Sequence, residues 1–201
     1  MRNEMLRVAA ALIAALLVVG CGSSRGPSAA STVPAALLRE ARPIGLGVRF
    51  HSPSTGPVIG SCRRWLGPRT GVHVELFAEN RVVLVAPGIG TRPPRAFSAG
   101  RITRARCYGA LVTLDPTGVV LVRRGLRLSL ADLFHSWGEP LSRSRLASFP
   151  APRGTRVAAF VDGQRWHGPP AAVPLTTGSE IVLEVGPHVP PHRSFTFPPG
   201  A

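Results

Sequence analysis

The chain has 201 residues, 44% of them hydrophobic, and a formal net charge of +14. Its 24 basic residues are all arginine, and they are spread along the chain without a block of five or six. A nucleic-acid-binding protein gathers its basic residues on one face or in one motif, so this composition argues against nucleic acid as a partner. We expect a solvated basic surface, with anionic lipid headgroups or wall polymer as the alternative role of the arginines.

The N-terminal segment starts with basic residues, continues with an apolar run from Val8 to Val19, and ends in Val18-Val19-Gly20-Cys21. A run of about twelve apolar residues is shorter than the roughly 20 that cross a bilayer. The segment resembles the lipobox of bacterial lipoproteins, in which cleavage precedes a cysteine that carries diacylglycerol. The resemblance implies a signal peptide at 1–20, lipidation of Cys21, and a lipid anchor on the extracytoplasmic face of the cell membrane.

Residues 21–42 would then hold the lipidated cysteine and a stalk, because their Gly, Ser, Ala and Pro residues bury too little apolar surface to fold. Residues 43–201 are expected to form a single β-rich domain, and no later apolar run is long enough for a membrane span.

With Cys21 used for the lipid, Cys62 and Cys107 remain. In an oxidising compartment such a pair is expected to form a disulfide, which would stabilise the domain by roughly 3 to 4 kcal/mol. The alternative is two small buried residues that do not meet. No CxxC pair is present, which argues against a zinc site built from cysteines.

Three segments predict pairs of strands. Residues 72–85 read as a hairpin around Glu79-Asn80-Arg81, and residues 108–122 contain two strands around Asp115-Pro116-Thr117-Gly118. Residues 156–166 predict a second hairpin, with an Asp162-Gly163 turn, and residues 180–185 predict a further strand.

One helix is expected between these segments. Ser129 and Asp132 form a capping box, and Gly138 followed by Pro140 marks the end. The apolar residues follow the i, i+3, i+4, i+7 spacing: Leu130, Leu133, Phe134 and Trp137. We therefore expect a mainly β (α+β) fold, a compact β-rich domain built from hairpins with one short helix packed on the sheet and with Phe134 and Trp137 in the core.

The domain also resembles a group of uncharacterised, histidine-rich, exported or membrane-anchored prokaryotic proteins. The similarity lies in Gly71–Leu76, Pro87–Gly90, Cys107, Leu111–Val122, Leu130–Gly138 and Leu175–Val185. In that group, histidines at strand spacing are typical of a transition-metal site. Here most of them are replaced, at Gly71, Glu75, Val112, Leu114, Leu121 and Gly178.

Ligand atoms remain at His73, Glu75 and Asp115, which are weak candidates for a metal site. His73 and Glu75 are two residues apart, so they share one face of a strand. The favoured interpretation is a scaffold that has lost its metal chemistry, with His73 as an ordinary strand histidine that faces solvent or is hydrogen-bonded beneath a loop. The other histidines, including His188 and His192, are expected at the surface.

No nucleophile elbow, S-x-x-K motif or paired acids are present, so the sequence favours a non-enzymatic protein and indicates no catalytic residue and no cofactor. The leading hypothesis is a membrane-anchored envelope lipoprotein that binds a ligand or partner protein. One alternative is a metal-binding protein or metal-dependent enzyme that uses His73, Glu75 and Asp115. Another is a structural protein that associates with anionic wall polymer.

Overall fold

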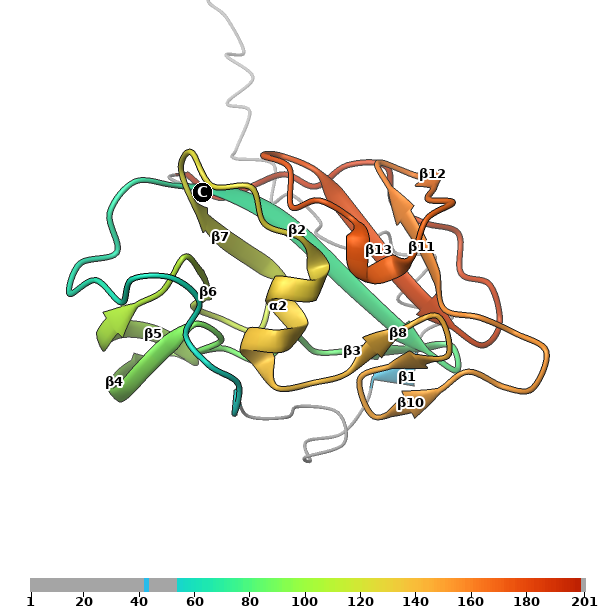
Figure 1. Ribbon diagram of the computed structural model, residues 1–201, viewed down its shortest axis with the longest axis horizontal. Helices are drawn as coiled ribbons and strands as arrows, with labels where there is room; N and C mark the ends of the chain where they lie inside the picture. The colour runs from blue at the N-terminus through green and yellow to red at the C-terminus, as the bar shows by residue number, and fades with distance from the viewer. Residues whose placement is uncertain (1–41, 44–53, 200–201) are drawn as a thin grey trace, which may run out of the picture. The chain divides into compact units, whose positions relative to one another are not determined.

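The computed structural model describes residues 42–43 and 54–199, and the fold of this part is mainly β, with one short α-helix, as predicted (Figure 1). The expected signal peptide, Cys21 and the stalk up to residue 41 lie outside the described residues. None of the helices in the described ranges has the length and apolar character that a bilayer crossing requires.

The large sheet is centred on the ten-residue strand β2 (Arg69–Ala78). On one edge, β2 pairs in parallel with β13 (Glu180–Val185), which continues antiparallel to β11 (Ala158–Val161) and then to β12 (Gln164–Arg165). On the other edge, the two ends of β2 have different partners. The first half pairs with β7 (Val119–Arg123), and the last three residues pair with β3 (Arg81–Val83).

Both hairpins predicted from turn sequences are confirmed. Glu79 and Asn80 join β2 to β3 with φ values of 51° and 64°, and Asp162 and Gly163 join β11 to β12 with φ values of 52° and 77°. Two consecutive residues with positive φ are typical of a type I′ turn, whose twist matches that of the flanking strands. The predicted strands on either side of Asp115–Gly118 are β6 (Leu111–Thr113) and β7, which pair antiparallel.

The structure also contains strands that the sequence did not predict. The arginine-rich hairpin of β4 (Thr91–Ser98) and β5 (Arg101–Tyr108) forms a separate two-stranded sheet. The remaining elements are short: β1 (Arg42–Pro43), β8 (Leu141–Ser142), β9 (Arg145–Leu146), β10 (Phe149–Pro150) and the 3₁₀ helix η1 (Pro170–Ala172).

The helix α2 (Leu130–Trp137) has the predicted bounds and caps. The Asp132 carboxylate accepts a hydrogen bond of 2.8 Å from the backbone N–H of Ser129, which precedes the helix. Gly138 ends the helix in the left-handed conformation, with φ of 88°. Phe134 and Trp137 are buried, as expected for core residues.

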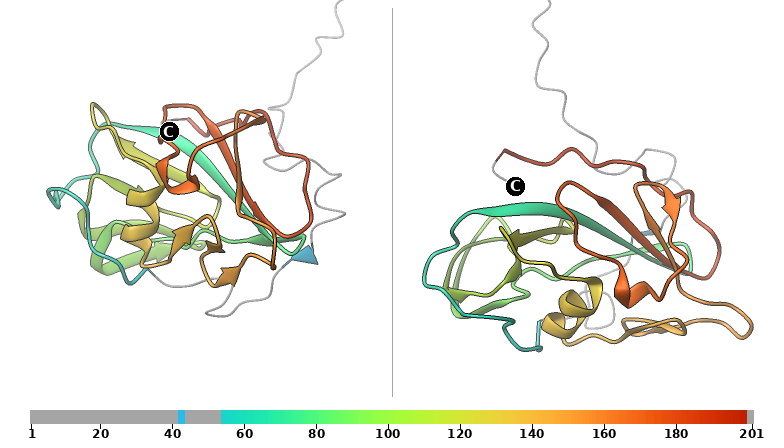
Figure 2. Two further views of the ribbon diagram at one scale, coloured as in Figure 1. Left: turned by 45° about the vertical axis from the view of Figure 1, so that its right-hand side comes forward. Right: turned by 45° about the horizontal axis from the view of Figure 1, so that its top comes forward.

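The two faces of the sheet are covered by different parts of the chain (Figure 2). Alternate residues of β2 and β13, such as Val74 and Leu183, belong to the main core together with α2. The opposite face, which carries Phe77 and Val182, packs against Val189 of the C-terminal segment (residues 187–199). Because strand residues alternate between faces, the polar residues of β2 and β13 lie under this segment.

The predicted disulfide between Cys62 and Cys107 is present, with a Cα–Cα distance of 5.3 Å. It links the segment before β2 to the end of β5. Paired backbone hydrogen bonds between Arg63 and Tyr108, of 2.9 and 2.8 Å, hold the same two segments together.

Candidate metal centre

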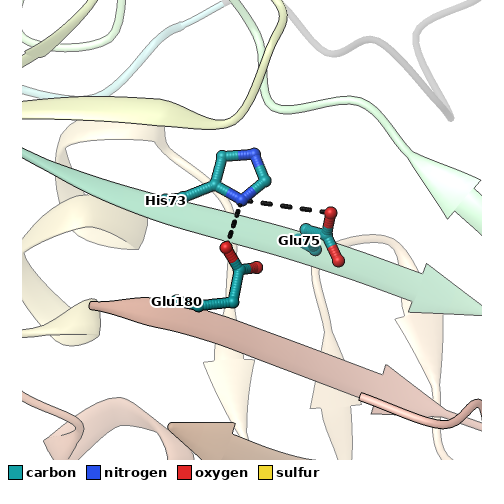
Figure 3. A group of neighbouring side chains, drawn as sticks. All are labelled: His73, Glu75 and Glu180. Carbon is teal, nitrogen blue, oxygen red and sulfur yellow. Dashed lines mark hydrogen bonds and ion pairs between the residues drawn. The ribbon is translucent and has the colours of Figure 1, made fainter. Parts of the chain in front are cut away.

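A group of three buried polar side chains lies on the face of the sheet beneath the C-terminal segment: His73 and Glu75 from β2, and Glu180 from β13 (Figure 3). The parallel register sets His73 directly beside Glu180. Paired residues of neighbouring strands point to the same face, as do residues two apart on one strand. One nitrogen or oxygen atom from each side chain lies within 4.8 Å of those of the other two.

His73 is held in one orientation by the loop before β7. Its Nε2 is 2.8 Å from the backbone oxygen of Thr117, and because a carbonyl oxygen only accepts, Nε2 carries the proton and donates it. The loop approaches this closely because residue 118 is glycine. A Cβ atom there would lie 2.5 Å from the Val74 carbonyl oxygen and 3.0 Å from His73 Nε2.

The other ring nitrogen of His73 faces the two carboxylates. Nδ1 is 2.7 Å from Oε2 of Glu180 and 3.9 Å from Oε1 of Glu75. With the proton on Nε2, a neutral imidazole presents a lone pair at Nδ1, directly opposite acceptor oxygens. A histidine that donates one N–H to a backbone carbonyl and turns its free nitrogen toward carboxylates has the arrangement of a metal ligand.

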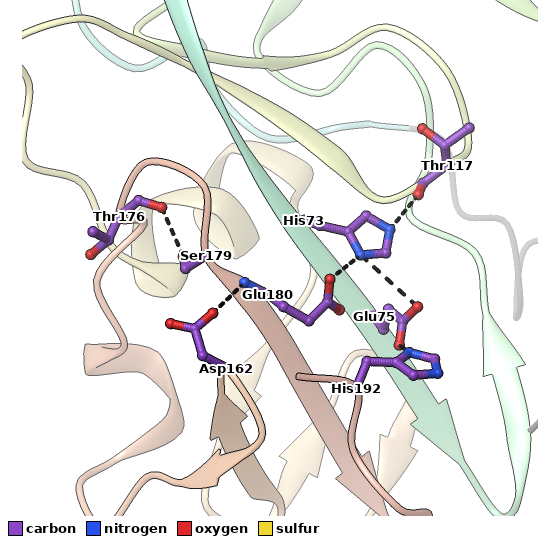
Figure 4. A network of polar contacts seen from close by, with 8 residues as sticks. All are labelled: His73, Glu75, Thr117, Asp162, Thr176, Ser179, Glu180 and His192. Carbon is purple, nitrogen blue, oxygen red and sulfur yellow. Dashed lines mark hydrogen bonds and ion pairs between the residues drawn. The ribbon is translucent and has the colours of Figure 1, made fainter. Parts of the chain in front are cut away.

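Glu180 is fixed by the hairpin that precedes β13. Its backbone N–H donates a 2.9 Å hydrogen bond to the carboxylate of Asp162, and the Asp162 N–H donates back to the Glu180 carbonyl at 2.8 Å. The neighbouring Ser179 hydroxyl donates to the carbonyl of Thr176 at 2.7 Å (Figure 4). The start of β13, and with it the Glu180 side chain, is therefore anchored from the backbone.

Glu75 receives a hydrogen bond from the C-terminal segment, because Nδ1 of His192 donates to its Oε2 (Figure 4). Burial, and after it the charge of Glu180, raise the pKa of the Glu75 carboxyl to about 8. Burial, followed by repulsion from His73, lowers the pKa of His192. His192 thus favours its neutral form, in which Nδ1–H donates and fixes the orientation of Glu75.

The C-terminal segment closes the group from solvent. The Phe195 ring stacks on the His73 ring, with centroids 3.7 Å apart and an angle of 14° between the planes. Phe197 packs edge-on against Phe195. His73, Glu75, Glu180 and His192 all have exposed fractions of 7% or less. A buried group with two carboxylates needs compensation for its charge.

Three buried atoms of this group have no hydrogen-bond partner among the described residues: Oε1 of Glu75, Oε1 of Glu180 and Nε2 of His192. The first two belong to the candidate ligands. Donor atoms around a tetrahedral zinc ion lie about 3.4 Å apart, as its bond lengths require. The distances of 2.7 and 3.9 Å from His73 Nδ1 to the two carboxylates bracket this value. The residues present therefore fit a divalent cation.

The structure brings together two of the three metal candidates from the sequence, His73 and Glu75, and adds Glu180 in place of Asp115. The Asp115 carboxylate instead interacts with Arg101 and with the hydroxyl of Thr117, the residue whose carbonyl holds His73. His73 is hydrogen-bonded beneath a loop, which was one of the two placements expected for an ordinary strand histidine.

Of the histidines expected at the surface, His188 is exposed and hydrogen-bonds to Glu184, but the prediction was wrong for His192, which is buried. His192 follows two prolines and belongs to no helix or strand, so its residue pattern gives no sign that the segment crosses the sheet. Glu180 could have been found from its place at the start of a predicted strand, but its position beside His73 depends on the parallel pairing.

Comparisons with protein-family models, with curated proteins and with solved structures found no match to this chain. The resemblances to bacterial lipoproteins and to the histidine-rich group remain predictions.

Proposed function

We propose that this protein is a membrane-anchored, extracytoplasmic lipoprotein whose β-rich domain binds one divalent transition-metal ion through His73, Glu75 and Glu180. The observation that carries the proposal is the orientation of His73, whose Nε2–H is donated to the Thr117 carbonyl while Nδ1 faces two buried carboxylates. In this arrangement the Thr117 carbonyl and His192 orient the metal ligands without binding the metal themselves.

The donor set favours zinc. One imidazole nitrogen and two carboxylate oxygens suit zinc better than calcium, which takes six to eight oxygens, or magnesium, which keeps several waters. Two ionised carboxylates carry a charge of −2, and a divalent ion neutralises them inside a site that water does not reach. The bound ion also supplies a partner for the two orphaned carboxylate oxygens.

The burial of the site supports a binding role over a catalytic one. Three protein ligands leave a fourth position in a tetrahedral shell, as in catalytic zinc sites. Here that position lies beneath Phe195 and the rest of the C-terminal segment, so a substrate reaches it only when the segment moves. We therefore propose a metal-binding protein without hydrolytic activity, in which the metal stabilises the fold or is carried.

The competing proposal is the ligand- or partner-binding scaffold without metal. It is favoured by the internal pairing of the group: if His73 and His192 both carried a proton, each would form an ion pair with one glutamate, and the charges would balance. In that case the four side chains form a structural network and the function lies elsewhere on the domain.

The test is the zinc stoichiometry of the full chain, purified in detergent without a metal-binding tag, stripped with chelator and dialysed against zinc. We expect about one equivalent bound, as for a single three-ligand site. His73→Ala and Glu180→Gln should abolish binding. Glu184→Gln is the matched control, since Glu184 is a buried glutamate of the same strand that pairs with His188 outside the centre. Wild-type protein that stays metal-free, or an equal loss in the control, would contradict the proposal.

A further inference from the structure

A separate groove with a volume of about 720 Å³ lies between residues 64–66 and the β4–β5 hairpin. Arg64 and Trp65 line it from the first segment, and Arg104 and Arg106 line it from β5. Ile102 and other apolar residues contribute to its lining as well. The groove shares none of its lining residues with the candidate metal centre.

The groove is strongly basic. Arg64, Arg104 and Arg106 are exposed, and its lining contains no acidic residue. Neither Arg104 nor Arg106 has a side-chain hydrogen bond or ion pair with any described residue, whereas Arg101 on the same strand pairs with Asp115. A concave surface lined by charges of one sign concentrates ions of the opposite sign. The free guanidinium groups can each bind a carboxylate or phosphate with two parallel hydrogen bonds.

Trp65 adds a flat apolar surface to these charges. Its side chain is 75% exposed, which makes it the most exposed large hydrophobic residue in the described part of the chain. The Arg64 guanidinium lies 5.5 Å from the centre of the ring. An exposed tryptophan beside cations suits a ligand that is apolar on one face and anionic at its edge, as is a sugar ring that carries an acidic group.

Both walls of the groove are fixed in place before any ligand arrives. The disulfide joins Cys62 to Cys107, each of which is close in sequence to one wall. The two hydrogen bonds between Arg63 and Tyr108 connect the same walls beside it. A site that is already ordered loses less conformational entropy on binding, so its groups bind more tightly than the same groups on a mobile loop.

We propose that this groove binds an acidic polysaccharide, with a sugar ring stacked on Trp65 and its carboxylate or phosphate groups held by Arg64, Arg104 and Arg106. A polysaccharide fits better than a lipid surface, because the groups converge in a concave groove. It fits better than single-stranded nucleic acid, which is bound by several aromatic residues that stack successive bases. The proposal is independent of the metal centre.

The test measures binding of the full chain, in detergent, to three polymers: polygalacturonate, phosphorylated dextran and unmodified dextran. We expect binding to one or both acidic polymers, which tells whether carboxylate or phosphate is preferred, and none to neutral dextran. Arg104→Gln with Arg106→Gln should weaken binding by roughly tenfold or more, since two charge-assisted contacts are lost. Trp65→Ala should weaken it by roughly threefold or more.

The matched control is Arg124→Gln with Arg127→Gln, which removes two exposed arginines outside the groove and changes the net charge equally. It should weaken binding by less than about twofold. An equal loss in this control would reduce the effect to overall charge and overturn the proposal, as would a Trp65→Ala variant that binds like wild type. Binding confined to anionic vesicles or to single-stranded DNA would also overturn it. Zinc content should not change in the groove variants, so the two proposals fail separately.

Discussion

Replacing Glu75 by glutamine distinguishes a metal centre from an ion-pair network. Glutamine has the shape of glutamate and its side-chain oxygen still accepts the hydrogen bond from His192. What it loses is the negative charge and the carboxylate that faces His73 Nδ1. The two models therefore predict different stabilities for the same protein.

The metal model predicts a large effect of zinc on the wild type. A ligand present at 100 times its Kd stabilises the folded state by about 2.7 kcal/mol. In a domain of this size, 1 kcal/mol changes Tm by roughly 2 to 4 °C. We therefore expect zinc to raise the Tm of the wild type by roughly 5 to 11 °C and that of Glu75→Gln by less than about 2 °C. Glu184→Gln, which leaves the centre intact, should keep the wild-type shift.

The two models also differ for the protein without metal. In an ion-pair network, removal of one buried charge costs about 3 to 5 kcal/mol, because its partner remains unpaired. In the metal model, the metal-free wild type already holds a buried carboxylate that is unfavourably placed, so Glu75→Gln should unfold at the same temperature or above it. Thermal unfolding followed by circular dichroism, with chelator and then with zinc, measures both quantities. A glutamine variant destabilised without metal and a wild type indifferent to zinc would refute the metal model.

Three further substitutions test the structure around the two sites by denaturant unfolding. Loss of the disulfide through Cys62→Ala with Cys107→Ala should cost about 4 kcal/mol, the loop-closure value for a separation of 45 residues. Gly118→Ala should cost about 2 kcal/mol and weaken zinc binding, because its Cβ collides with a backbone oxygen; Gly100→Ala, with a similar φ but open space around it, should cost less and leave zinc binding unchanged. Arg69→Met should cost about 3 kcal/mol or more, since it leaves four carbonyl oxygens without their guanidinium donor; an unchanged midpoint for any variant would contradict its assigned contact.

The elements predicted correctly are those encoded by short stretches of sequence. Asp162-Gly163 and Glu79-Asn80 favour tight turns because these residue types accept positive φ, and the strands on either side follow. The β4–β5 hairpin was missed because the signal depends on burial. Most residues of β4 are exposed, and two prolines interrupt it, so the strand lacks the alternation of apolar and polar residues that reveals a half-buried strand.

The candidate site was half predicted for the same reason. His73 and Glu75 are neighbours on one strand, and strand periodicity alone puts them on one face. Glu180 is 107 residues from His73, and only the parallel pairing of β13 with β2 brings them together. Parallel strands need a long connection, so their register is not written in any local turn. His192 is more remote still, since no regular element carries it.

The alternation of β2 has a meaning that the sequence alone does not disclose. A strand with Val72, Val74 and Leu76 on one face and His73 and Glu75 on the other normally turns its polar face to water. Here both faces are buried, because the C-terminal segment covers the polar one. That segment has no helix or strand of its own and is held by contacts that include Phe195 on His73 and His192 on Glu75. A metal ion that fixes His73 and Glu75 would therefore also stabilise the segment that encloses it, so metal binding and closure of the centre should be thermodynamically coupled.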